Sequence, residues 1–515
     1  MHEILPRMRL SAVMAGTGAR GGLSDDPEIT AVTGDSRQVV PGAVFFALPG
    51  ARLDGHAFAA EAARRGAAAV VAERPVECGP ALLLLVPSAR RAMALAAAAL
   101  RGHPGRDLAL AGVTGTNGKT TVSYLLEACA LAAGRPCGVI GTITHRFPGV
   151  TRPASHTTPE STEIQALLGE MRDAGARLAI MEISSHALAQ ERVAGLRFAV
   201  AGFTNLTRDH LDYHGDMDGY FAAKRRLFVE HLAPDGTAVV NARDPWGARL
   251  ADQLGPGRQV WRYGTRLEDA LRPEGLEPSL AGTRFTLRTP RGEVAVRSPL
   301  VGAHNVENLL CAAGMALALG LPPGAVARGL AASRGAPGRL ERIDGPGFQA
   351  FVDYAHTDDA LTRVQEALRA LGPRRLLTVF GCGGDRDRGK RPLMGQAAGR
   401  LADLAVVTSD NPRSEDPLRI VGEIVGGLEA LGRRRLSAAE ALAGQDGYVV
   451  EPDRRAAVEL AVACARQGDA VLVAGKGHEA YQLVGAERRH FDDAEEVRRA
   501  LRLDVEGGPP APAPT

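Results

Sequence analysis

This sequence has few aromatic residues, no closely paired cysteines and no excess of charge of either sign. Phe, Trp and Tyr make up 4% of 515 residues, too few for a large base-stacking surface on single-stranded nucleic acid. The 61 basic and 59 acidic residues nearly cancel, so the charge balance demands neither nucleic acid nor an anionic membrane as partner. The six cysteines form no CxxC pair, which excludes a disulfide scaffold and the usual zinc spacings.

Long apolar runs are also missing. The most apolar stretch, 81–100, is interrupted by Pro87 and two arginines, whereas a membrane span needs about 20 mostly apolar residues. The N-terminal residues are broken by charge and make a poor signal peptide. We therefore expect a cytoplasmic protein with no membrane and no nucleic acid as partner. We also expect a monomer, although no sequence feature determines the oligomeric state.

What the chain does contain is a repeated alternation of apolar, strand-like segments and Ala-rich helical segments, which is typical of α/β domains. At roughly 100–200 residues per domain, 515 residues predict about three domains. We place an N-terminal α/β domain at 1–105, a central parallel-sheet domain at 106–335 and a C-terminal Rossmann-like domain at 336–505. Residues 506–515, EGGPPAPAPT, predict a disordered tail.

Within these domains the apolar segments predict individual elements. The predicted strands are 43–48, 67–72, 82–86, 108–113, 139–143, 178–183, 199–203, 348–353, 376–380, 404–408 and 470–474. Helices are predicted at 92–100 and 120–133, and another should end within 312–320. The turn-rich, alternating segment 265–300 predicts antiparallel strands inside the central domain.

The strongest local signal is GVTGTNGKTT at 112–121, between an apolar strand and a helix. Glycines in such a loop let backbone N–H groups turn toward phosphate oxygens, and the helix N-terminus adds positive charge. Lys119 would reach the β/γ-phosphates of a nucleotide and Thr120 would bind Mg²⁺. The strict pattern has Gly where this chain has Val113, so the loop is a variant. The alternative is a Gly-rich strand-to-helix turn without a ligand.

This loop variant resembles the nucleotide loop of the Mur ligase family, the ATP-dependent amide-forming ligases of peptidoglycan precursor synthesis. Further motifs follow in the family's order across about 35–480. They are TTP at 157–159, MEISSH at 181–186, TNLTRDHLDYH at 204–214, Lys224, GAHNVEN at 302–308, GRLE at 338–341, DYAH at 353–356 and GKGHE at 475–479. The resemblance implies three α/β domains that bind a UDP-sugar, ATP and an amino acid in that order.

Two motifs narrow the resemblance to the branch that adds the third residue of the stem peptide. They are GCGGDRDRGKRPLM at 381–394 and DNPR at 410–413. In the family, DNPR is associated with meso-diaminopimelate. The resemblance thus implies ATP-dependent ligation of meso-diaminopimelate to UDP-N-acetylmuramoyl-L-alanyl-D-glutamate (UDP-MurNAc-L-Ala-D-Glu) through an acyl phosphate. The chain departs from the family at Asp358, where Pro is usual, but an acid suits a helix start.

Other functions remain open at this point. Within the family, the alternatives are an L-lysine-adding ligase and folylpolyglutamate synthase, and Asp410-Asn-Pro-Arg413 argues against both. Outside it, the alternative is a P-loop NTPase that makes no amide bond. A third alternative is a catalytically silent member that acts as a nucleotide-sugar binding module, and the presence of Lys119, Glu182, His210 and Lys224 argues against it.

The resemblance also implies site residues. The catalytic set is Lys119, Glu182, His210 and Lys224. The Mg²⁺ ligands are Thr120, Glu182, His210 and Lys224, the last as a carbamate. The ATP-binding set is Gly115, Thr116, Asn117, Gly118, Lys119, Thr120, Thr121, His304, Asn305, Arg339 and Asp353. The UDP-MurNAc-dipeptide set is Gly34, Ser36, Ala51, Arg52, Leu53, His156, Thr157, Thr158, Ser184, Gln190 and Arg192. The diaminopimelate set is Arg386, Asp410, Asn411, Pro412, Arg413, Gly475 and Glu479.

Chemistry supports part of this assignment. Arg413 can hold the distal carboxylate of diaminopimelate bidentately, and L-lysine would leave that guanidinium unpaired. Hydroxyls and carboxylates suit Mg²⁺.

Several of these residues also have a plainer interpretation. Glu182 can be a surface or helix-capping acid, and His210 a buried, hydrogen-bonded histidine. Lys224, within YFAAKRRLF, is typical of a solvated helix face. Asn305 can be a helix N-cap, and DNPR a proline turn.

Overall fold

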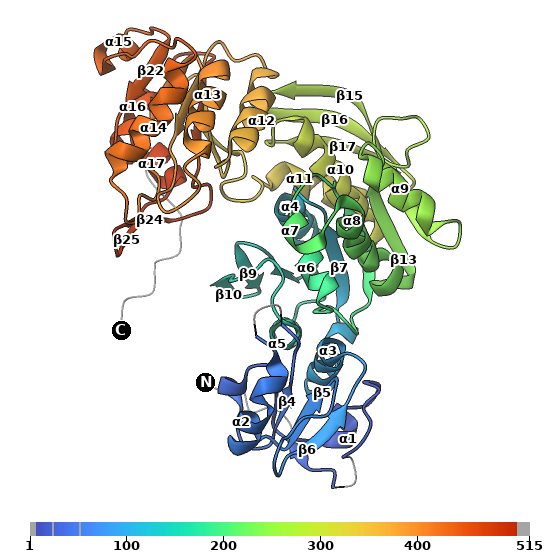
Figure 1. The fold of residues 1–515 in the computed structure, drawn as a ribbon. Helices are drawn as coiled ribbons and strands as arrows, with labels where there is room; N and C mark the ends of the chain where they lie inside the picture. Colours follow the sequence, from blue (N-terminus) through green and yellow to red (C-terminus); the bar gives the residue numbers. More distant parts are fainter. Residues whose placement is uncertain (1–6, 23–24, 51–52, 502–515) are drawn as a thin grey trace. The chain divides into compact units, whose positions relative to one another are not determined.

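Short apolar segments flanked by glycine-rich turns form the strands of three successive sheets, and the helices between them cover the sheets (Figure 1). The computed structural model describes residues 7–22, 25–50 and 53–501. The chain separates into two units, which we call unit 1 (1–273, 287–294 and 307–330) and unit 2 (274–286, 295–306 and 331–515). The predicted disordered tail, 506–515, lies outside the described residues. In the described part, no helix is long and apolar enough to cross a bilayer.

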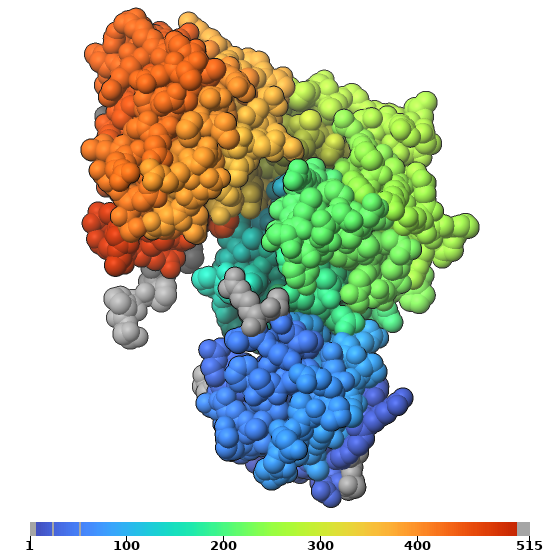
Figure 2. Space-filling view, viewed as in Figure 1, coloured from blue at the N-terminus to red at the C-terminus, as the bar shows by residue number. Residues whose placement is uncertain are grey.

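The N-terminal sheet of unit 1 has four parallel strands in the order β3-β4-β5-β6. They are Ala31–Thr33, Ala43–Phe46, Ala69–Ala72 and Leu82–Leu85. Alternate residues of β4 enter two core clusters, one shared with α1 and α3 and the other with α2. These helices are Leu10–Val13, Ala89–Leu100 and Ala59–Arg64. The N-terminal part of the chain, which contains this sheet and its helices, is coloured blue in Figure 2.

The N-terminal predictions are confirmed for β4, β5, β6 and α3. The strand β3 was missed because only three residues form it. A separate two-stranded sheet joins β1 (Met8–Arg9) to β2 (Glu28–Ile29).

The central sheet of unit 1 has eight strands in the order β10-β9-β8-β11-β7-β12-β13-β14. Six of them, β8, β11, β7, β12, β13 and β14, are parallel, and the hairpin β9–β10 adds two antiparallel strands at one edge. Their bounds are β7 Ala109–Thr114, β8 Cys137–Ile140, β9 Thr144–Phe147, β10 Val150–Pro153, β11 Leu178–Glu182, β12 Phe198–Phe203, β13 Leu232–Asn241 and β14 Gln259–Tyr263. The four predicted central strands are confirmed, whereas β13 and β14 were missed.

The helices of the middle of the chain lie between these strands, except for the last two, which come after all eight strands in the chain. They are α4 Lys119–Ala132, α5 Ser161–Asp173, α6 Ser185–Ala189, α7 Leu211–His214, α8 Met217–Arg226, α9 Pro245–Leu254, α10 Ala303–Ala318 and α11 Pro323–Ala332. The predicted helix 120–133 is α4, and α10 ends within the predicted interval.

The segment predicted to be antiparallel forms a three-stranded sheet, β15-β16-β17. Its strands are Arg272–Ser279, Gly282–Thr289 and Gly292–Ser298. Only two residues separate each strand from the next, and a connection that short can join only antiparallel neighbours. The prediction for 265–300 is therefore confirmed.

Unit 2 is built on a six-stranded sheet in the order β18-β19-β23-β20-β21-β22, parallel except for β18. The bounds are β18 Glu341–Asp344, β19 Gln349–Asp353, β20 Leu376–Phe380, β21 Leu404–Val407, β22 Gly447–Val450 and β23 Ala470–Ala474. The four strands predicted here are β19, β20, β21 and β23. A further hairpin pairs β24 (Tyr481–Val484) with β25 (Glu487–His490).

Two helix layers cover this sheet, one on each face. One core cluster includes α12 (Asp358–Arg369), α13 (Lys390–Leu401) and α14 (Pro417–Glu429). The other includes α15 (Ala438–Leu442), α16 (Arg454–Cys464) and α17 (Asp493–Ala500). The helix α12 begins at Asp358 with Thr357 as its N-cap, as expected from the acid at that position.

Candidate active site

The glycine-rich loop between β7 and α4 has the backbone that phosphate binding requires. Gly118 is the N-cap of α4 with φ +88°, and Gly115 has φ +148°, conformations that L side chains rarely adopt. Space is also restricted: a Cβ on Gly115 would lie 1.8 Å from Thr204 Oγ1, and one on Gly118 would lie 2.3 Å from Asn308 Oδ1. Both glycines are thus needed for the loop to keep this shape.

The segment 204–207, which follows β12, forms hydrogen bonds with the glycine-rich loop. Thr204 Oγ1 donates to the Asn117 carbonyl at 2.6 Å, and Asn205 accepts from Asn117 N through its side chain and from Thr116 N through its carbonyl. Thr116 Oγ1 in turn accepts from Thr207 N at 3.0 Å. The motif at 204–214 therefore shapes the phosphate loop, a role that its sequence alone did not suggest for Thr204 and Asn205.

Lys119 and Lys224 converge on one backbone oxygen of this loop. Each Nζ donates to the Gly115 carbonyl at 2.8 Å, and Lys119 also donates to the Thr116 carbonyl at 2.9 Å. Lys224 is 1% exposed, and burial together with the positive charge of Lys119 sets its pKa well below the usual value.

The interpretation of Lys224 as a solvated helix residue is wrong. The helix α8 buries the face that carries Tyr220, Phe221 and Lys224, so residues four apart point inward together. Lys224 Nζ lies 4.7 Å from the centroid of the Tyr220 ring.

Glu182 ends β11 and is 1% exposed, which excludes a surface acid. Its Oε2 accepts from Thr120 Oγ1 and from Thr142 Oγ1, both at 2.8 Å. Its Oε1 accepts from Thr142 N at 3.1 Å and Ser123 Oγ at 3.3 Å. The structure brings Thr120 and Glu182 together as predicted, and it adds Thr142, which the sequence reasoning missed. Carboxylate and hydroxyl oxygens grouped in this way fit Mg²⁺.

His210 is the N-cap residue of α7, with φ +52° and a side chain that is 47% exposed. The interpretation as a buried, hydrogen-bonded histidine is therefore wrong. Its ring contacts His186 edge-on, with centroids 4.8 Å apart, and Asp209 Oδ2 lies 3.5 Å from its Nε2. Among the described residues, no three His, Cys, Asp or Glu side chains are grouped so that they could hold a metal ion.

His186 and His214 complete an aromatic group that the sequence reasoning did not single out. His214 Nε2 hydrogen-bonds to Ser185 Oγ at 2.9 Å, and its ring stacks on Tyr220 with centroids 5.1 Å apart. Burial and the neighbouring positive charges lower the pKa of His214 to about 4, so it is neutral at pH 7. A signal did exist, since both histidines belong to the motifs at 181–186 and 204–214.

Residues assigned to the dipeptide form a connected group next to Glu182. Thr158 Oγ1 donates to the Glu182 carbonyl at 2.7 Å and accepts from Ser184 N at 3.0 Å. Arg192 donates to the Thr158 carbonyl at 2.7 Å and to Gln190 Oε1 from both Nε and Nη2.

Two further residues of the dipeptide set are Thr157 and His156. Thr157 Oγ1 lies 3.1 Å from Thr142 Oγ1 and can donate to it, because the Thr142 proton goes to Glu182; Thr157 therefore adjoins the Glu182 cluster, whereas His156 is exposed beside Ser155.

The described residues assigned to the UDP-sugar lie in the connections that follow β3 and β4 of unit 1, outside the strands themselves. Ser36 begins a short 3₁₀ helix that Asp35 caps, and it is buried. A Cβ on Gly34 would lie 2.8 Å from Leu48 Cδ1, so a side chain at this position would require Leu48 to shift. Leu53 is 70% exposed, and Ala51 and Arg52 lie outside the described residues.

In unit 2, Asp353 organises the residues assigned to the nucleotide. It ends β19, and its carboxylate accepts from Leu340 N at 2.7 Å and Ala355 N at 2.9 Å. Burial raises its pKa. The guanidinium of Arg339 lies over the Tyr354 ring, 4.9 Å from the centroid.

His304 and Asn305 lie in the first turn of α10, which begins at Ala303. Asn305 is 2% exposed and its Nδ2 donates to the Val301 carbonyl at 2.9 Å. Because the helix begins two residues before Asn305, the N-cap interpretation of this residue is wrong.

The residues assigned to the amino acid meet at the carboxyl ends of β20, β21 and β23, where parallel sheets place ligands. Asn411 Nδ2 donates to Glu479 Oε2 at 3.0 Å, and a Cβ on Gly475 would lie 2.7 Å from Asp410 Oδ2. Asp410 and Asn411 are 7% and 4% exposed, so DNPR is more than a solvent-exposed turn.

Arg413 follows Pro412 in a left-handed conformation, φ +52°, and donates to the Gly384 carbonyl at 2.7 Å. A Cβ on Gly383 would lie 2.8 Å from Arg413 Nη1 and 3.8 Å from Arg386 Cγ, so both arginines flank this glycine.

The hairpin β24–β25 also contacts this group, which the sequence did not predict. Arg413 pairs with Val484, its N–H donates to the Leu483 carbonyl at 3.0 Å, and Gln482 Nε2 donates to the Asp410 carbonyl at 2.7 Å. The hairpin thereby holds the DNPR segment in place.

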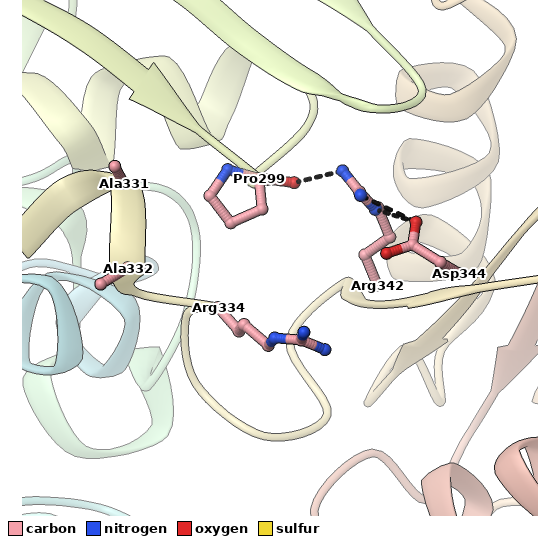
Figure 3. Close-up of a pocket in the computed structure, with 6 residues that line it drawn as sticks. All are labelled: Pro299, Ala331, Ala332, Arg334, Arg342 and Asp344. Atoms are coloured by element: carbon pink, nitrogen blue, oxygen red, sulfur yellow. Dashed lines mark hydrogen bonds and ion pairs between the residues drawn. The ribbon is translucent and has the colours of Figure 1, made fainter. Parts of the chain in front are cut away.

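A separate polar hollow in unit 2 lies outside these motifs (Figure 3). Its lining residues are Pro299, Ala331, Ala332, Arg334, Arg342 and Asp344. Arg342 is occupied by Asp344, 2.7 Å from its Nη2, and by the Ala281 and Pro299 carbonyls. This hollow is therefore a weaker candidate for a ligand site than the carboxyl ends of β20, β21 and β23.

Three family models match the chain in succession. They are described as Mur ligase family, catalytic domain over 28–103, Mur ligase middle domain over 113–316 and Mur ligase, glutamate ligase domain over 338–477. The chain belongs to the Mur ligase family, and it has the family's three-domain α/β architecture.

Relatives include two proteins named UDP-N-acetylmuramoyl-L-alanyl-D-glutamate--2,6-diaminopimelate ligase. The one from Geobacter metallireducens is 50% identical over 92% of this chain and 94% of its own length. The one from Gloeobacter violaceus is 47% identical over 96% and 99%. A solved structure of the same name is 36% identical with a TM-score of 0.71, covering 92% of this chain and 95% of that one.

Proposed function

We propose that this chain is an ATP-dependent ligase that joins meso-diaminopimelate to UDP-MurNAc-L-Ala-D-Glu. The observation that carries the proposal is the group at the strand ends of unit 2, where two carboxylates, an amide and Arg413 meet. The distal end of diaminopimelate carries one ammonium and one carboxylate, so it matches this set, whereas the distal end of L-lysine lacks the carboxylate. The names of the relatives support the same substrates.

The first half of the reaction activates a carboxylate. A carboxylate oxygen of the D-glutamyl residue attacks the γ-phosphorus of ATP, giving an acyl phosphate and ADP. Phosphoryl transfer depends mainly on positioning and charge neutralisation. The loop 115–118, the N-terminus of α4 and Lys119 supply positive electrostatic potential for the phosphates.

Mg²⁺, when bound, neutralises negative charge on the transferring phosphoryl group. Thr120 and Glu182 are the residues that would hold it first, because their oxygens already lie 2.8 Å apart in a buried, oxygen-rich group. His210 and Lys224 are proposed for a second ion. For that role the neutral Lys224 amine takes up CO₂ and loses a proton, which gives a carbamate. The lowered pKa of Lys224 favours the neutral amine that this step needs.

The second half forms the amide. The amine of diaminopimelate attacks the acyl carbon, phosphate leaves, and a proton is lost from nitrogen. Arg413, with Arg386 nearby, would bind the distal carboxylate, and Asp410 and Glu479 would accept from the distal ammonium. The reaction belongs to cytoplasmic peptidoglycan precursor synthesis, and the chain acts as a monomer.

The decisive experiment measures phosphate release from ATP with UDP-MurNAc-L-Ala-D-Glu, comparing meso-diaminopimelate with L-lysine. We expect release to require both substrates and to be much faster with diaminopimelate. Release with lysine instead would overturn the assignment of Arg413. Release without either substrate would favour a plain NTPase.

A further inference from the structure

Lysine is scarce in this chain. Of its 61 basic residues, only Lys119, Lys224, Lys390 and Lys476 are lysines, so arginine supplies the surface charge almost everywhere. An ammonium is a compact point charge, whereas a guanidinium is a wider planar fork. A buried lysine in such a composition therefore indicates a place where the compact cation is needed. Lys119 and Lys224 belong to the phosphate site. Lys476 is buried in unit 2 and hydrogen-bonds to Asn411 instead.

Lys476 lies in the amino-acid site, directly after Gly475, and its side chain is 0% exposed. Its Nζ donates to Asn411 Oδ1 at 3.1 Å. The same Nζ lies 3.8 Å from Glu479 Oε2 and 4.0 Å from Asp410 Oδ1. It therefore lies within ion-pair distance of the two acids that are proposed to accept from the distal ammonium of the substrate, and it hydrogen-bonds to Asn411 beside them.

The contacts of Asn411 show what Lys476 does to this group. Asn411 Oδ1 accepts from both Lys476 Nζ and Leu483 N, and its Nδ2 donates to Glu479 Oε2. Lysine can only donate and an ionised carboxylate can only accept, so this chemistry permits one orientation of the amide. Without Lys476, one of the two donors that hold Asn411 Oδ1 would be lost.

The charges of the neighbouring side chains also indicate a role for Lys476. Asp410 and Glu479 are two acids in a largely buried site, and burying both without a cation would be costly. Arg454, the other buried cation that acts on Lys476, is held by Asp493 through two hydrogen bonds of 2.7 Å. One ammonium between two carboxylates leaves a net negative charge, which suits a single incoming ammonium.

We propose that Lys476 is a positioning residue for the diamino acid: it orients Asn411 and holds Asp410 and Glu479 as a receptor for the distal ammonium. This inference rests on the proposed function. Lys476 acts through these three side chains and not on the reacting atoms. Its loss should therefore raise KM for diaminopimelate far more than it lowers kcat.

The test compares steady-state kinetics of the wild type with Lys476→Met, which keeps the length of the side chain and removes the charge. We expect KM for diaminopimelate to rise roughly 30-fold or more, the usual effect of truncating one partner of a buried charge pair. KM for ATP and for UDP-MurNAc-L-Ala-D-Glu should stay within about twofold of the wild type. A merely structural role would instead lower kcat and leave KM for diaminopimelate unchanged, and that result would overturn the proposal.

Arg434→Met is the matched control, since it removes an exposed cation of unit 2 that pairs with Glu440 and contacts none of the residues assigned to the amino acid. It should leave all three KM values unchanged. Lys476→Gln, which keeps a donor for Asn411, is judged by the same criterion if Lys476→Met does not fold.

Chemical rescue of a truncated Lys476 variant by a small amine gives a second measurement. In Lys476→Ala, ethylammonium chloride should lower KM for diaminopimelate relative to sodium chloride at equal ionic strength, and absence of any rescue would count against the proposal. If the wild type itself does not use diaminopimelate, the proposed function has failed, and this is separable from a failure of the role of Lys476.

Discussion

Lys224 in unit 1 and Lys476 in unit 2 are both buried lysines, yet their surroundings are opposite. Lys224 shares the Gly115 carbonyl with a second lysine, Lys119. Lys476 lies within 4.0 Å of two carboxylates, on Asp410 and Glu479. Burial lowers the pKa of both lysines, but like charge lowers it further for Lys224, whereas the acids oppose the shift for Lys476.

The difference teaches how one side-chain type serves two chemical tasks. A lysine that burial and like charge hold toward the neutral form is suited to react with CO₂, as proposed for Lys224. A lysine flanked by carboxylates stays charged more readily and is suited to organise a receptor for a cationic substrate. The residue type alone does not distinguish the two roles.

The comparison of Lys224 with Lys476 requires that the loop around Lys119 and Lys224 binds the phosphates of ATP. Replacing Lys119 by Met should lower kcat/KM by about 10³-fold, because a preorganised cation on the transferring phosphoryl group is lost. KM for diaminopimelate should not change, since the amino-acid residues lie at other strand ends. Steady-state assays with each substrate varied would measure both. A loss below tenfold would show that this loop is not the phosphate site.

The proposed carbamate on Lys224 gives the next largest effect. Lys224→Arg keeps the cation but cannot form the carbamate, so we expect a loss of about 10²-fold in kcat. Carboxylic acids such as propionate should restore part of the activity of Lys224→Ala.

The pH dependence of carbamylation follows from the lowered pKa of Lys224. The amine is neutral above its pKa, so a lowered value extends carbamylation to lower pH than an ordinary lysine allows. Mass spectrometry of the wild type with and without bicarbonate, over a pH series, would measure this. A modified fraction that falls off at the pH of an exposed lysine would contradict the proposal.

On the other side of the comparison, Arg413→Met should reduce the preference for diaminopimelate over L-lysine by roughly 30-fold. The distal carboxylate would lose its partner, whereas lysine has no such group to lose. The ratio of kcat/KM for the two amino acids is the measurement. Arg434→Met serves again as a control, because Arg434 is exposed and pairs with Glu440. An unchanged ratio would place the distal carboxylate elsewhere.

The smallest expected effect concerns the hydrogen bond from Thr142 to Glu182. Thr142→Val removes a hydroxyl that donates to Glu182 Oε2 at 2.8 Å, and should lower the free energy of unfolding by about 1 kcal/mol. Urea titration would measure it. The Mg²⁺ concentration needed for half-maximal activity should also rise. Thr151→Val, on the exposed face of β10, is the matched control and should be neutral.

Strand ends were the part of the site that sequence patterns predicted well. Glu182 and Asp410 each follow an apolar run, and parallel strands bring their carboxyl ends to one edge of a sheet. The same reasoning failed for Thr142, because the predicted strand 139–143 ran through it. The actual strand β8 ends at Ile140, which leaves Thr142 in the loop beside Glu182.

Helix faces and short hairpins were predicted less well. Lys224 lies among arginines, and only the packing of α8 shows which face is covered. The hairpin β24–β25 has no fully buried side of its own, so its apolar pattern is weak, although it contacts Arg413 and Asp410. Such elements are stabilised by what they pack against, and this information is distant in the sequence.

By itself, the sequence determined the α/β class, most strands, the phosphate loop and the order of the motifs, because hydrophobic period and glycine placement are local properties. Only the tertiary structure decided that Lys224 and Lys119 share one carbonyl, that Thr142 supports Glu182, and that Lys476 lies between two acids. These facts depend on distances between residues far apart in the chain. The charge state and orientation of a buried side chain follow from such neighbours, and folding brings those neighbours together.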